Sequence, residues 1–375
     1  MKVVQLLPAL NAGGVERGTL DLARALVQGG HESIVISSGG RLTAQLQREG
    51  SRHIQMPVHR KSLFSLTLVR PLRRLIHELQ PDVVHVRSRV PAWLTWFAWR
   101  GLDPRTRPRL VSTAHGLYSI NRYSAIMARS EQAIAISRCV KHYLQENYSR
   151  YLQAEPEIIY RGVDTGTFNR DTPLPDHWQE EVCREFPSLA GKKWLLLPGR
   201  LTRWKGQEDF IRLIAALVQA HPPLAEQIQG VILGGAEENK QHYAGELQTL
   251  AQSLGVAGHI CFVGHRSDIQ HWYRQAAVVY NLSQKPEPFG RTVIEAAAVG
   301  TPIIGYDIGG PAESLQDCFP QGLVENGNAA QLLDKTRQIL GGSARPQLAP
   351  AFTLATQAEQ TIALYRRLIA RGPAT

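Results

Sequence analysis

Two glutamates, Glu287 and Glu295, lie eight positions apart in EPFGRTVIEAAAVG, where nearly all other residues are small or apolar. Carboxylates are rarely buried without a partner. Two carboxylates about 5 to 10 Å apart can serve as the acid and base of a glycoside hydrolase. Alternatively, a carboxylate can hold a ligand, because it accepts hydrogen bonds from a pair of vicinal hydroxyls such as those of a ribose.

The local pattern places both glutamates at one end of a strand. VVYNLS is predicted to be a strand and TVIEAAAVG a helix, so EPFG forms the loop between them. Gly290 precedes the helix, which leaves the N–H groups of its first turn available to a ligand. Glu295 lies about one turn into the helix and can point back toward the same cavity. Taken alone, Glu295 could also be an exposed helix residue.

The segment PGRLTRWKG carries two cations, Arg200 and Lys205, just past another predicted strand and near a helix that begins around Gly206. Cations beside a helix N-terminus suit a diphosphate. The alternative is a solvated basic loop. The chain has no DxD, no HExxH and no Cys/His cluster with metal spacing, so we expect no catalytic metal. Protein cations would then stabilise a leaving diphosphate.

Two motifs in the first half follow predicted strands. NAGGVERG contains Gly13 and Gly14, which allow close backbone approach to a ligand at a helix N-terminus. A tight structural turn is an equally good interpretation of this loop by itself. STAHG places His115 at the carboxyl end of a strand, where it can donate a hydrogen bond to a ligand. A structural histidine with satisfied partners is the alternative.

The elements that position these motifs alternate between short apolar strands and amphipathic helices, which predicts an α/β fold of two doubly wound, Rossmann-like domains. Ligands of such sheets bind outside the carboxyl ends of the strands. We expect domains at 1–175 and 190–350. The stretch between them, 165–189, is expected to be a linker with a short helix. A final helix at about 355–375 is expected to pack back on the first domain.

The composition is globular, with 42 Lys+Arg against 32 Asp+Glu and a formal net charge of +10. A basic chain favours phosphorylated small molecules, anionic membranes or nucleic acid. No RRM, helix-turn-helix or zinc pattern supports nucleic acid. Four scattered cysteines, the lack of a recognisable secretory signal and the lack of an 18-residue apolar run lead us to expect a cytoplasmic protein.

A basic amphipathic segment at 59–79 could contact an anionic membrane or a phosphorylated acceptor, although a surface helix with its apolar side in the core is the more ordinary interpretation. Trp93, Trp96 and Trp99 recur every three residues and share one broad helix face. Core packing is favoured for them, with an acceptor or membrane contact as the alternative.

With these motifs in this order, nearly the whole chain resembles the GT-B glycosyltransferases, specifically glycosyltransferase family 4. The resemblance implies two Rossmann-like domains facing a cleft, the first binding the acceptor and the second a nucleotide diphosphate sugar. It also implies retaining, metal-independent hexosyl transfer to a saccharide or lipid-linked acceptor. The order and spacing look similar to those of bacterial enzymes of lipopolysaccharide core and other envelope saccharides, which implies work at the cytoplasmic face of the inner membrane.

The resemblance assigns roles to matching residues. Gly13 and Gly14 would approach a phosphate, and His115 would contact the transferred sugar. Glu287 and the N–H groups of Phe289 and Gly290 would address the sugar hydroxyls. The implied catalytic set is His115, Arg200, Lys205 and Glu287, and the implied donor-binding set is Gly13, Gly14, Arg200, Lys205, Glu287, Phe289, Gly290, Arg291, Thr292 and Glu295.

The sequence departs from the family pattern at two places, and two other classes of enzyme remain as alternatives. Arg161 in IIYRGVDTGTF stands where the family often has Asn, and HVRSRVPAW is more basic than expected. A glycoside hydrolase using Glu287 and Glu295 would leave the basic loop unexplained. A nucleotide-sugar epimerase of the same fold would act without an acceptor.

Overall fold

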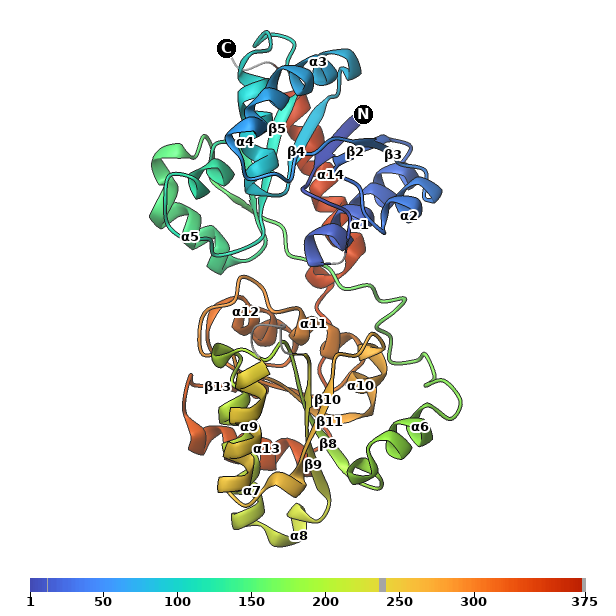
Figure 1. Ribbon diagram of the computed structural model, residues 1–375, viewed down its shortest axis with the longest axis vertical. Helices are drawn as coiled ribbons and strands as arrows, with labels where there is room; N and C mark the ends of the chain where they lie inside the picture. Colours follow the sequence, from blue (N-terminus) through green and yellow to red (C-terminus); the bar gives the residue numbers. More distant parts are fainter. Residues whose placement is uncertain (12, 236–240, 373–375) are drawn as a thin grey trace. The chain divides into compact units, whose positions relative to one another are not determined.

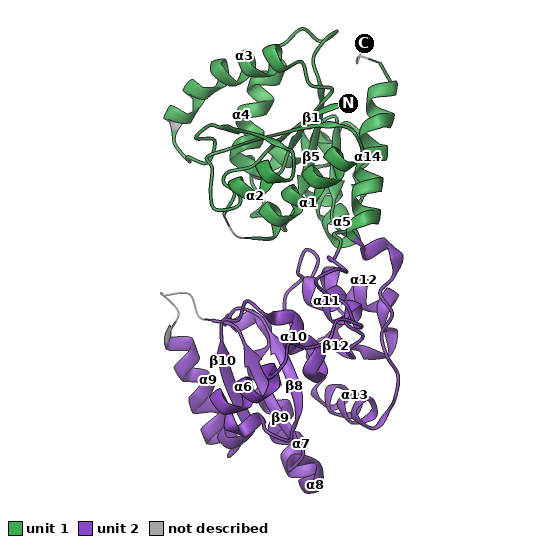
Figure 2. Ribbon diagram, turned by 90° about the vertical axis from the view of Figure 1, so that its right-hand side faces the viewer, with its two compact units in different colours: residues 1–162, 354–375 green, residues 163–353 purple. Residues whose placement is uncertain are grey.

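The computed structural model of the chain describes residues 1–11, 13–235 and 241–372. The chain forms two compact units (Figure 2), residues 1–162 together with 354–375, and residues 163–353. Each unit contains one parallel sheet with helices packed on its faces (Figure 1). Within the described residues, no helix is both long enough and apolar enough to span a bilayer.

The first unit contains a seven-stranded sheet in the order β3-β2-β1-β4-β5-β6-β7. All neighbouring strands pair in parallel. The central strands are short apolar runs because both faces are covered by helices. The strands are β1 Lys2–Leu6, β2 Glu32–Ser37, β3 Arg52–Gln55, β4 Val83–Val86, β5 Arg109–Ala114, β6 Gln132–Ala135 and β7 Glu157–Ile158.

The helices of the first unit bury apolar stripes against this sheet. The first of them begins at the predicted Gly-Gly turn, buries Leu22 and Leu26, and ends before Gly29 and Gly30. The α-helices are α1 Gly14–Gln28, α2 Thr43–Arg48, α3 Val69–Leu79, α4 Arg89–Arg100, α5 Arg138–Tyr148 and α14 Leu354–Ala370. The 3-10 helices are η1 Leu63–Leu68, η2 Ser124–Ala128 and η3 Ser149–Tyr151.

Helix α14 comes from the end of the chain and is part of the first unit (Figures 1 and 2). Leu364, Tyr365 and Leu368 lie in one apolar cluster with residues of β1, β4 and β5. The Tyr365 hydroxyl is 2.6 Å from Nδ1 of the buried His85, whose Nε2 is 2.7 Å from the Thr113 hydroxyl. This polar contact inside an apolar cluster fixes the helix against the centre of the sheet.

The second unit contains a six-stranded parallel sheet in the order β10-β9-β8-β11-β12-β13. Five short apolar segments of this half, KKWLLLP, GVILGG, HICFVG, VVYNLS and PIIGYD, form strands of the predicted alternating pattern. The strands are β8 Lys193–Pro198, β9 Ile228–Leu233, β10 Ile260–Gly264, β11 Ala276–Asn281, β12 Ile303–Tyr306 and β13 Leu323–Val324.

Helices cover both faces of this second sheet as well. The short helix expected in the 165–189 stretch is present as α6. The α-helices are α6 Trp178–Glu185, α7 Gln207–Ala220, α8 Pro222–Ala225, α9 Gln241–Ser253, α10 Ile269–Gln275, α11 Arg291–Ala298, α12 Gly309–Cys318 and α13 Ala329–Gly341. The 3-10 helices are η4 Pro187–Leu189, η5 Arg203–Lys205, η7 Ala257–His259, η8 Pro320–Gly322 and η9 Pro350–Phe352.

Strand order determines where each sheet can bind a ligand. In a doubly wound sheet the crevice opens at the carboxyl ends of the strands, where the chain switches direction across the sheet. That switch lies between β1 and β4 in the first unit and between β8 and β11 in the second. The motif loops identified from the sequence follow β1, β5, β8 and β11, so they all lie on these edges.

The basic amphipathic segment divides into two parts. In α3, the apolar Leu72, Ile76 and Leu79 are buried, so core packing accounts for that helix. In η1, by contrast, Phe64 is 84% exposed and Leu66 49% exposed. The tryptophans of α4 also differ, because Trp99 is buried and donates to the Pro108 carbonyl, whereas Trp93 and Trp96 are half-buried.

Candidate functional site

Lys205 and Glu287 form an ion pair in the second unit, at the carboxyl ends of β8 and β11. Lys205 Nζ lies 2.7 Å from Glu287 Oε1, and both side chains are largely buried. The Ser283 hydroxyl also donates to Glu287 Oε1. Charge-assisted bonds of this kind strengthen as water is excluded. The pair therefore holds a cation and a carboxylate side by side where a phosphosugar could bind.

The loop that carries Glu287 is fixed by the start of α12. The N–H of Gly310 donates to the Glu287 carbonyl at 2.9 Å. A Cβ on Gly310 would lie 2.6 Å from both Phe289 Cα and the Pro288 carbonyl oxygen. Only a residue without a side chain allows this approach, so the double glycine of α12 positions the loop.

Gly290 directly precedes α11 and has φ 77°, a left-handed conformation that favours glycine. A Cβ there would also overlap Pro311. Arg291 and Thr292 follow in the first turn, and Phe289 is buried with its ring centroid 6.0 Å from that of Phe352. The N–H groups at the start of α11 therefore face the same strand edge as Glu287.

Glu295 lies on α11 and is 7% exposed. Its Oε1 is 2.7 Å from Nη2 of Arg291, and its Oε2 accepts a hydrogen bond of 3.1 Å from the Tyr273 hydroxyl. Burial, followed by the charge of Glu295, raises the pKa of Tyr273 well above its usual value. Tyr273 therefore stays protonated and donates, which fixes the orientation of the carboxylate.

The two glutamates are thus held separately, each by one cation and one hydroxyl donor. A glycosidase instead needs one of its two carboxyl groups free to pass a proton to the leaving group. This arrangement disfavours the hydrolase hypothesis and suits two ligand-positioning groups.

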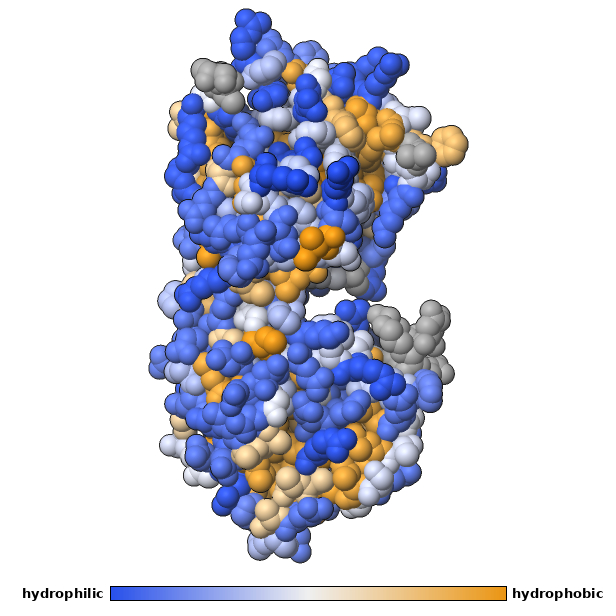
Figure 3. Space-filling model, turned by 90° about the vertical axis from the view of Figure 1, so that its left-hand side faces the viewer, coloured by the Kyte–Doolittle hydropathy of each residue, from blue (hydrophilic) through white to orange (hydrophobic). Residues whose placement is uncertain are grey.

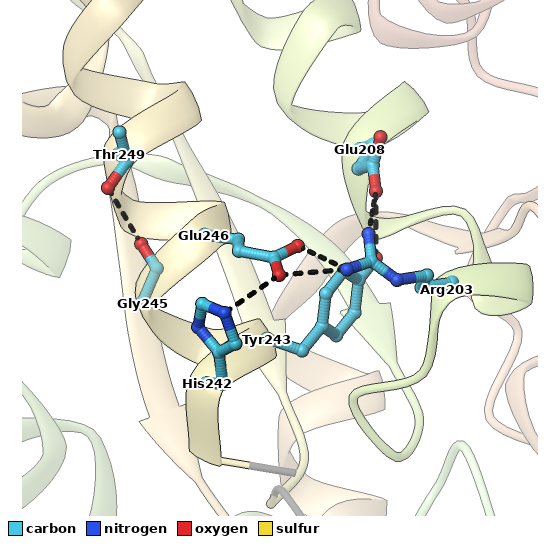
Figure 4. Close-up of polar contacts among 7 residues, drawn as sticks. All are labelled: Arg203, Glu208, His242, Tyr243, Gly245, Glu246 and Thr249. Carbon is cyan, nitrogen blue, oxygen red and sulfur yellow. Dashed lines mark hydrogen bonds and ion pairs between the residues drawn. The ribbon is translucent and has the colours of Figure 1, made fainter.

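The β8–α7 loop presents its cations in different ways. Arg200 is exposed, and its carbonyl accepts a bond from the Gln207 side chain at 3.0 Å. Arg203 instead bonds to α9 (Figure 4), with its Nη2 2.7 Å from Glu246 Oε2. Its guanidinium also lies over the Tyr243 ring and 3.8 Å from Glu208. Arg203 therefore anchors the loop, while Arg200 and Lys205 remain at the strand edge.

In the first unit, the Gly13–Gly14 loop begins α1. The Arg161 guanidinium donates to the Gly14 carbonyl at 2.5 Å, and a Cβ on Gly14 would lie 2.8 Å from its nitrogen atoms. Arg161, the residue that departs from the family pattern, therefore lies directly against this loop. The sequence alone did not show how Arg161 affects the site.

His115 follows β5 at the same edge of the first sheet. Its ring nitrogens are buried, and neither has a hydrogen-bond partner among the described residues. Burial lowers the pKa of His115 well below its usual value, and the charges of Arg87 and Arg161 add to this effect. The imidazole is therefore neutral at pH 7, with one N–H available to donate and one nitrogen to accept.

Three further residues complete these groups and were missed from the sequence. Ser283 could have been found, since it lies just past β11 where strand-end hydroxyls face ligands. Tyr273 comes from α10, and no local pattern connects it to Glu295. Arg87 follows β4 and was noted only as part of a basic segment. Within the described residues, no group of three or more His, Cys, Asp or Glu could hold a metal ion.

Comparison with protein families agrees with this geometry. The model of glycosyltransferase family 4 matches residues 12–167, and the model of glycosyl transferases group 1 matches residues 179–349. The two models together match most of the chain, a family 4 domain followed by a group 1 domain, and the chain is a glycosyltransferase. The expected α/β fold of two Rossmann-like domains is confirmed for this glycosyltransferase by solved structures of the same type.

Among solved structures, a glycosyltransferase from Rickettsia africae superimposes with a TM-score of 0.83 at 26% identity, covering 98% of each chain. HepE of Anabaena, solved with UDP and glucose, superimposes with a TM-score of 0.75 at 21% identity, covering 98% of this glycosyltransferase and 100% of HepE. At that identity the second likeness shows the fold alone.

Two sequence relatives have named activities. A lipopolysaccharide core biosynthesis mannosyltransferase of Rhizobium meliloti is 27% identical over 54% of this chain and 50% of its own length. A D-inositol 3-phosphate glycosyltransferase of Corynebacterium jeikeium is 27% identical over 70% of this chain and 67% of its own length. The match to the mannosyltransferase thus spans only half of that relative, and the two names imply different acceptors.

Proposed function

We propose that this glycosyltransferase moves a hexosyl group from a nucleotide diphosphate sugar to a saccharide or lipid-linked acceptor. The observation that carries the donor assignment is the Lys205–Glu287 ion pair beside the N-terminus of α11, 2.7 Å between Nζ and Oε1. A cation for phosphate, a carboxylate for sugar hydroxyls and the N–H groups of a helix N-terminus suit a nucleotide diphosphate sugar. The complex of HepE with UDP and glucose shows that this fold can bind such a ligand.

The proposed reaction retains the anomeric configuration and uses no metal ion. The bond between the anomeric carbon and the diphosphate oxygen breaks with oxocarbenium character. Arg200, Lys205 and the N-terminus of α11 take up the charge that develops on the diphosphate. The acceptor hydroxyl attacks from the same face, and its proton passes to the leaving phosphate oxygen. In the first unit, neutral His115 would donate a hydrogen bond to the transferred sugar.

For the acceptor, we favour a saccharide or lipid-linked saccharide of the bacterial envelope, with the lipopolysaccharide core as the leading case. The name of the Rhizobium mannosyltransferase supports this choice. The name of the Corynebacterium relative, a D-inositol 3-phosphate glycosyltransferase, supports a small phosphorylated acceptor instead. A thermal-shift screen can identify the base and the sugar of the donor, and the acceptor. A ligand at a hundred times its Kd stabilises the chain by about 2.7 kcal/mol.

The mechanism is tested by paired variants of one loop. Arg200→Ala should reduce kcat by about 100-fold or more while the melting temperature stays unchanged, because it removes a charge that stabilises the departing diphosphate. Arg203→Ala removes an equal charge three residues away, but one already bound to Glu246. Arg203→Ala should therefore lose less activity than Arg200→Ala, and near-normal turnover in Arg200→Ala would contradict the assignment.

Metal independence and stereochemistry have separate readouts. Transfer should continue at an unchanged rate in excess EDTA, because the proposed charge stabilisation uses protein cations alone. NMR of the product should show the anomeric configuration of the donor. A rate that falls sharply in EDTA and recovers with added Mg²⁺ or Mn²⁺ would contradict the metal-independent mechanism. A product with inverted anomeric configuration would contradict retention.

We also propose that the first unit contacts an anionic membrane, which would place the enzyme at the cytoplasmic face of the inner membrane. A groove of 490 Å³ between η1 and α4 is lined by Leu66, Trp93 and Phe97, with Arg60 and Lys61 among its lining residues. Phe64 beside it is 84% exposed. Figure 3 shows hydrophobic residues on one face of the first unit, with hydrophilic residues beside them. Aromatic and basic side chains together suit an anionic lipid surface.

Vesicle sedimentation tests this contact. The wild-type chain should bind phosphatidylglycerol vesicles more strongly than phosphatidylcholine vesicles. The double variant Phe64→Ser/Leu66→Ser should lose most of that binding, because two exposed apolar side chains no longer insert. Ile120→Ser is the matched control, since Ile120 is 67% exposed but does not line the groove. Equal binding by the double variant would rule out this surface.

A further inference from the structure

Asp209 lies in the first turn of α7 and contacts two segments that are distant from it in the chain. Its Oδ2 accepts a hydrogen bond of 3.0 Å from the Gln284 side chain and one of 2.8 Å from the Tyr306 hydroxyl. Gln284 lies in the loop after β11, and Tyr306 is the last residue of β12. Because α7 follows β8, one carboxylate oxygen connects the carboxyl ends of three neighbouring strands.

Tyr306 fixes the orientation of this carboxylate. The tyrosine is buried, and burial, followed by its hydrogen bond to Asp209, raises the pKa of the Tyr306 hydroxyl above its usual value. The hydroxyl is therefore protonated at neutral pH and donates to Asp209. A carboxylate in the first turn of a helix is also stabilised by the positive end of the helix dipole. Asp209 thus offers Gln284 an acceptor that is already held in place.

The backbone of Gln284 is bonded to the loop that carries Lys205. The N–H of Gln284 donates to the Trp204 carbonyl at 2.8 Å. Gly206, with φ 76°, lies against the end of β11, because a Cβ there would overlap the Leu282 carbonyl oxygen. Only glycine allows so close an approach in this conformation. The β8–α7 and β11–α11 loops therefore meet at Gln284.

The segment from Gln284 to Glu287 depends on this meeting point. Gln284, Lys285 and Pro286 are all exposed, so little packing holds them. Glu287 at the other end is buried and pairs with Lys205. The hydrogen bonds of Gln284 therefore decide where the segment starts, and the ion pair decides where it ends.

We propose that Asp209 is a positioning residue of the donor site, which acts through Gln284 on the segment 283–287. By this contact it keeps Glu287 within reach of Lys205. A loop that is ordered before the ligand arrives loses less conformational entropy on binding, so the ligand binds more tightly. The inference rests on the proposed function, in which Glu287 holds the sugar hydroxyls of the donor.

The affinities for two ligands test this role. Asp209→Ala should weaken binding of the sugar-bearing donor by about tenfold or more and leave that of the free nucleoside diphosphate within about twofold, because only the sugar contacts Glu287. Asp209→Asn should keep most of the donor affinity, since its carboxamide oxygen can accept both hydrogen bonds. Glu208→Ala, the control, should bind both ligands as wild type does. It removes an equal charge from the same turn, but Glu208 contacts the Tyr243 hydroxyl at 3.4 Å instead. Equal losses for both ligands in Asp209→Ala would overturn the proposal.

A charge placed at position 284 gives a second test. Gln284→Glu brings a carboxylate against that of Asp209, so repulsion should lower the donor affinity by about tenfold or more. Combining it with Asp209→Asn should restore most of that affinity, because the new carboxamide can donate to the new carboxylate. A loss that persists in the double variant would mean that the new charge repels the donor diphosphate directly, and it would overturn the positioning role.

Hydrogen exchange separates this inference from the proposed function, because it needs no ligand. The amides of Gln284, Lys285 and Glu287 should exchange about tenfold faster in Asp209→Ala than in wild type, and at nearly the wild-type rate in Asp209→Asn. Unchanged exchange in Asp209→Ala would overturn the positioning role. If wild type binds no nucleotide sugar but exchange still rises in Asp209→Ala, Asp209 positions the segment and only the proposed function fails.

Discussion

Glu287 and Glu295 are bound by different cations, and this separation predicts different roles. Glu295→Ala should weaken binding of the free nucleoside diphosphate by about 10- to 100-fold, since hydrogen bonds to a charged group contribute about 1.5–3 kcal/mol. Glu287→Ala should leave the affinity for the free nucleoside diphosphate within about twofold and weaken the sugar-bearing donor. Isothermal titration of both variants with the free nucleoside diphosphate and with the sugar-bearing donor measures these separate roles. An equal loss of affinity for the free nucleoside diphosphate in both variants would show that the two glutamates do not have separate roles.

The buried histidines of the first unit predict how its stability depends on pH. Burial lowers the pKa values of His85 and His115 well below 6.5 in the folded chain. Below pH 6.5 the unfolded chain binds protons that the folded chain does not, so stability is present above pH 6.5 and is lost as pH falls. The loss should approach about 1.4 kcal/mol per histidine and pH unit.

His115→Asn isolates one of these contributions. The free energy of unfolding lost between pH 7.5 and 5.5 should be smaller than in wild type by about 1.4 kcal/mol. Hydrogen exchange of the β4 and β5 amides at the two pH values measures it. Replacement of the exposed His59 by Asn is the control. The free energy of unfolding lost between the two pH values should differ between the two variants. An unchanged pH dependence in His115→Asn would contradict a neutral, buried imidazole.

At the scale of elements, the approach of α12 to the Glu287 loop depends on Gly310. Gly310→Ala should displace that loop, because the new Cβ would lie 2.6 Å from Phe289 Cα. Donor affinity should fall at least tenfold, and the melting temperature should fall by several degrees. Thermal denaturation and donor titration record the two effects.

Gly245→Ala in α9 is the matched control for this glycine. A Cβ there would meet no described heavy atom within 4 Å, and Gly245 lies inside a helix, where its carbonyl accepts from Thr249 (Figure 4). Alanine should therefore stabilise the chain by about 0.5–1 kcal/mol. A stabilised Gly310→Ala would show that α12 does not constrain the loop.

At the scale of the whole molecule, the end of the chain completes the first unit. Truncation after Thr353 would remove Leu364, Tyr365 and Leu368 from the apolar cluster and leave His85 without its Tyr365 partner. Loss of these three buried side chains costs about 5–9 kcal/mol, which is comparable to the whole stability of an ordinary domain. The first unit should unfold, while residues 163–353 keep their fold and still bind the nucleoside diphosphate.

Calorimetry and proteolysis separate the two outcomes of this truncation. The shortened chain should lose one unfolding transition, and a protease should remove the first unit and leave a resistant fragment that includes α7 and α11. A nucleoside diphosphate should protect that fragment further. Two intact transitions after truncation would show that α14 is dispensable for the first unit.

The sequence by itself determined the class of fold and the loops that carry the site. Alternating short apolar strands and amphipathic helices require a parallel sheet covered on both faces, and such sheets present ligands at the carboxyl ends of their strands. Gly13, His115, Lys205 and Glu287 could therefore be placed on those ends before any coordinates, because strand-to-helix loops are visible in local pattern.

Tertiary structure alone decided which of these residues are held by which partners. Lys205 meets Glu287 across 82 positions, because the neighbouring strands β8 and β11 are distant in the chain. Arg161 meets Gly14 across 147 positions, although β7 and β1 are not neighbours in the sheet. Local periodicity carries no information on such pairs. It also could not show that Arg203 is bound to α9 while Arg200 is exposed, although both belong to one basic loop. Contacts between distant elements decide which charged side chains are paired and buried, and this decides the role of each.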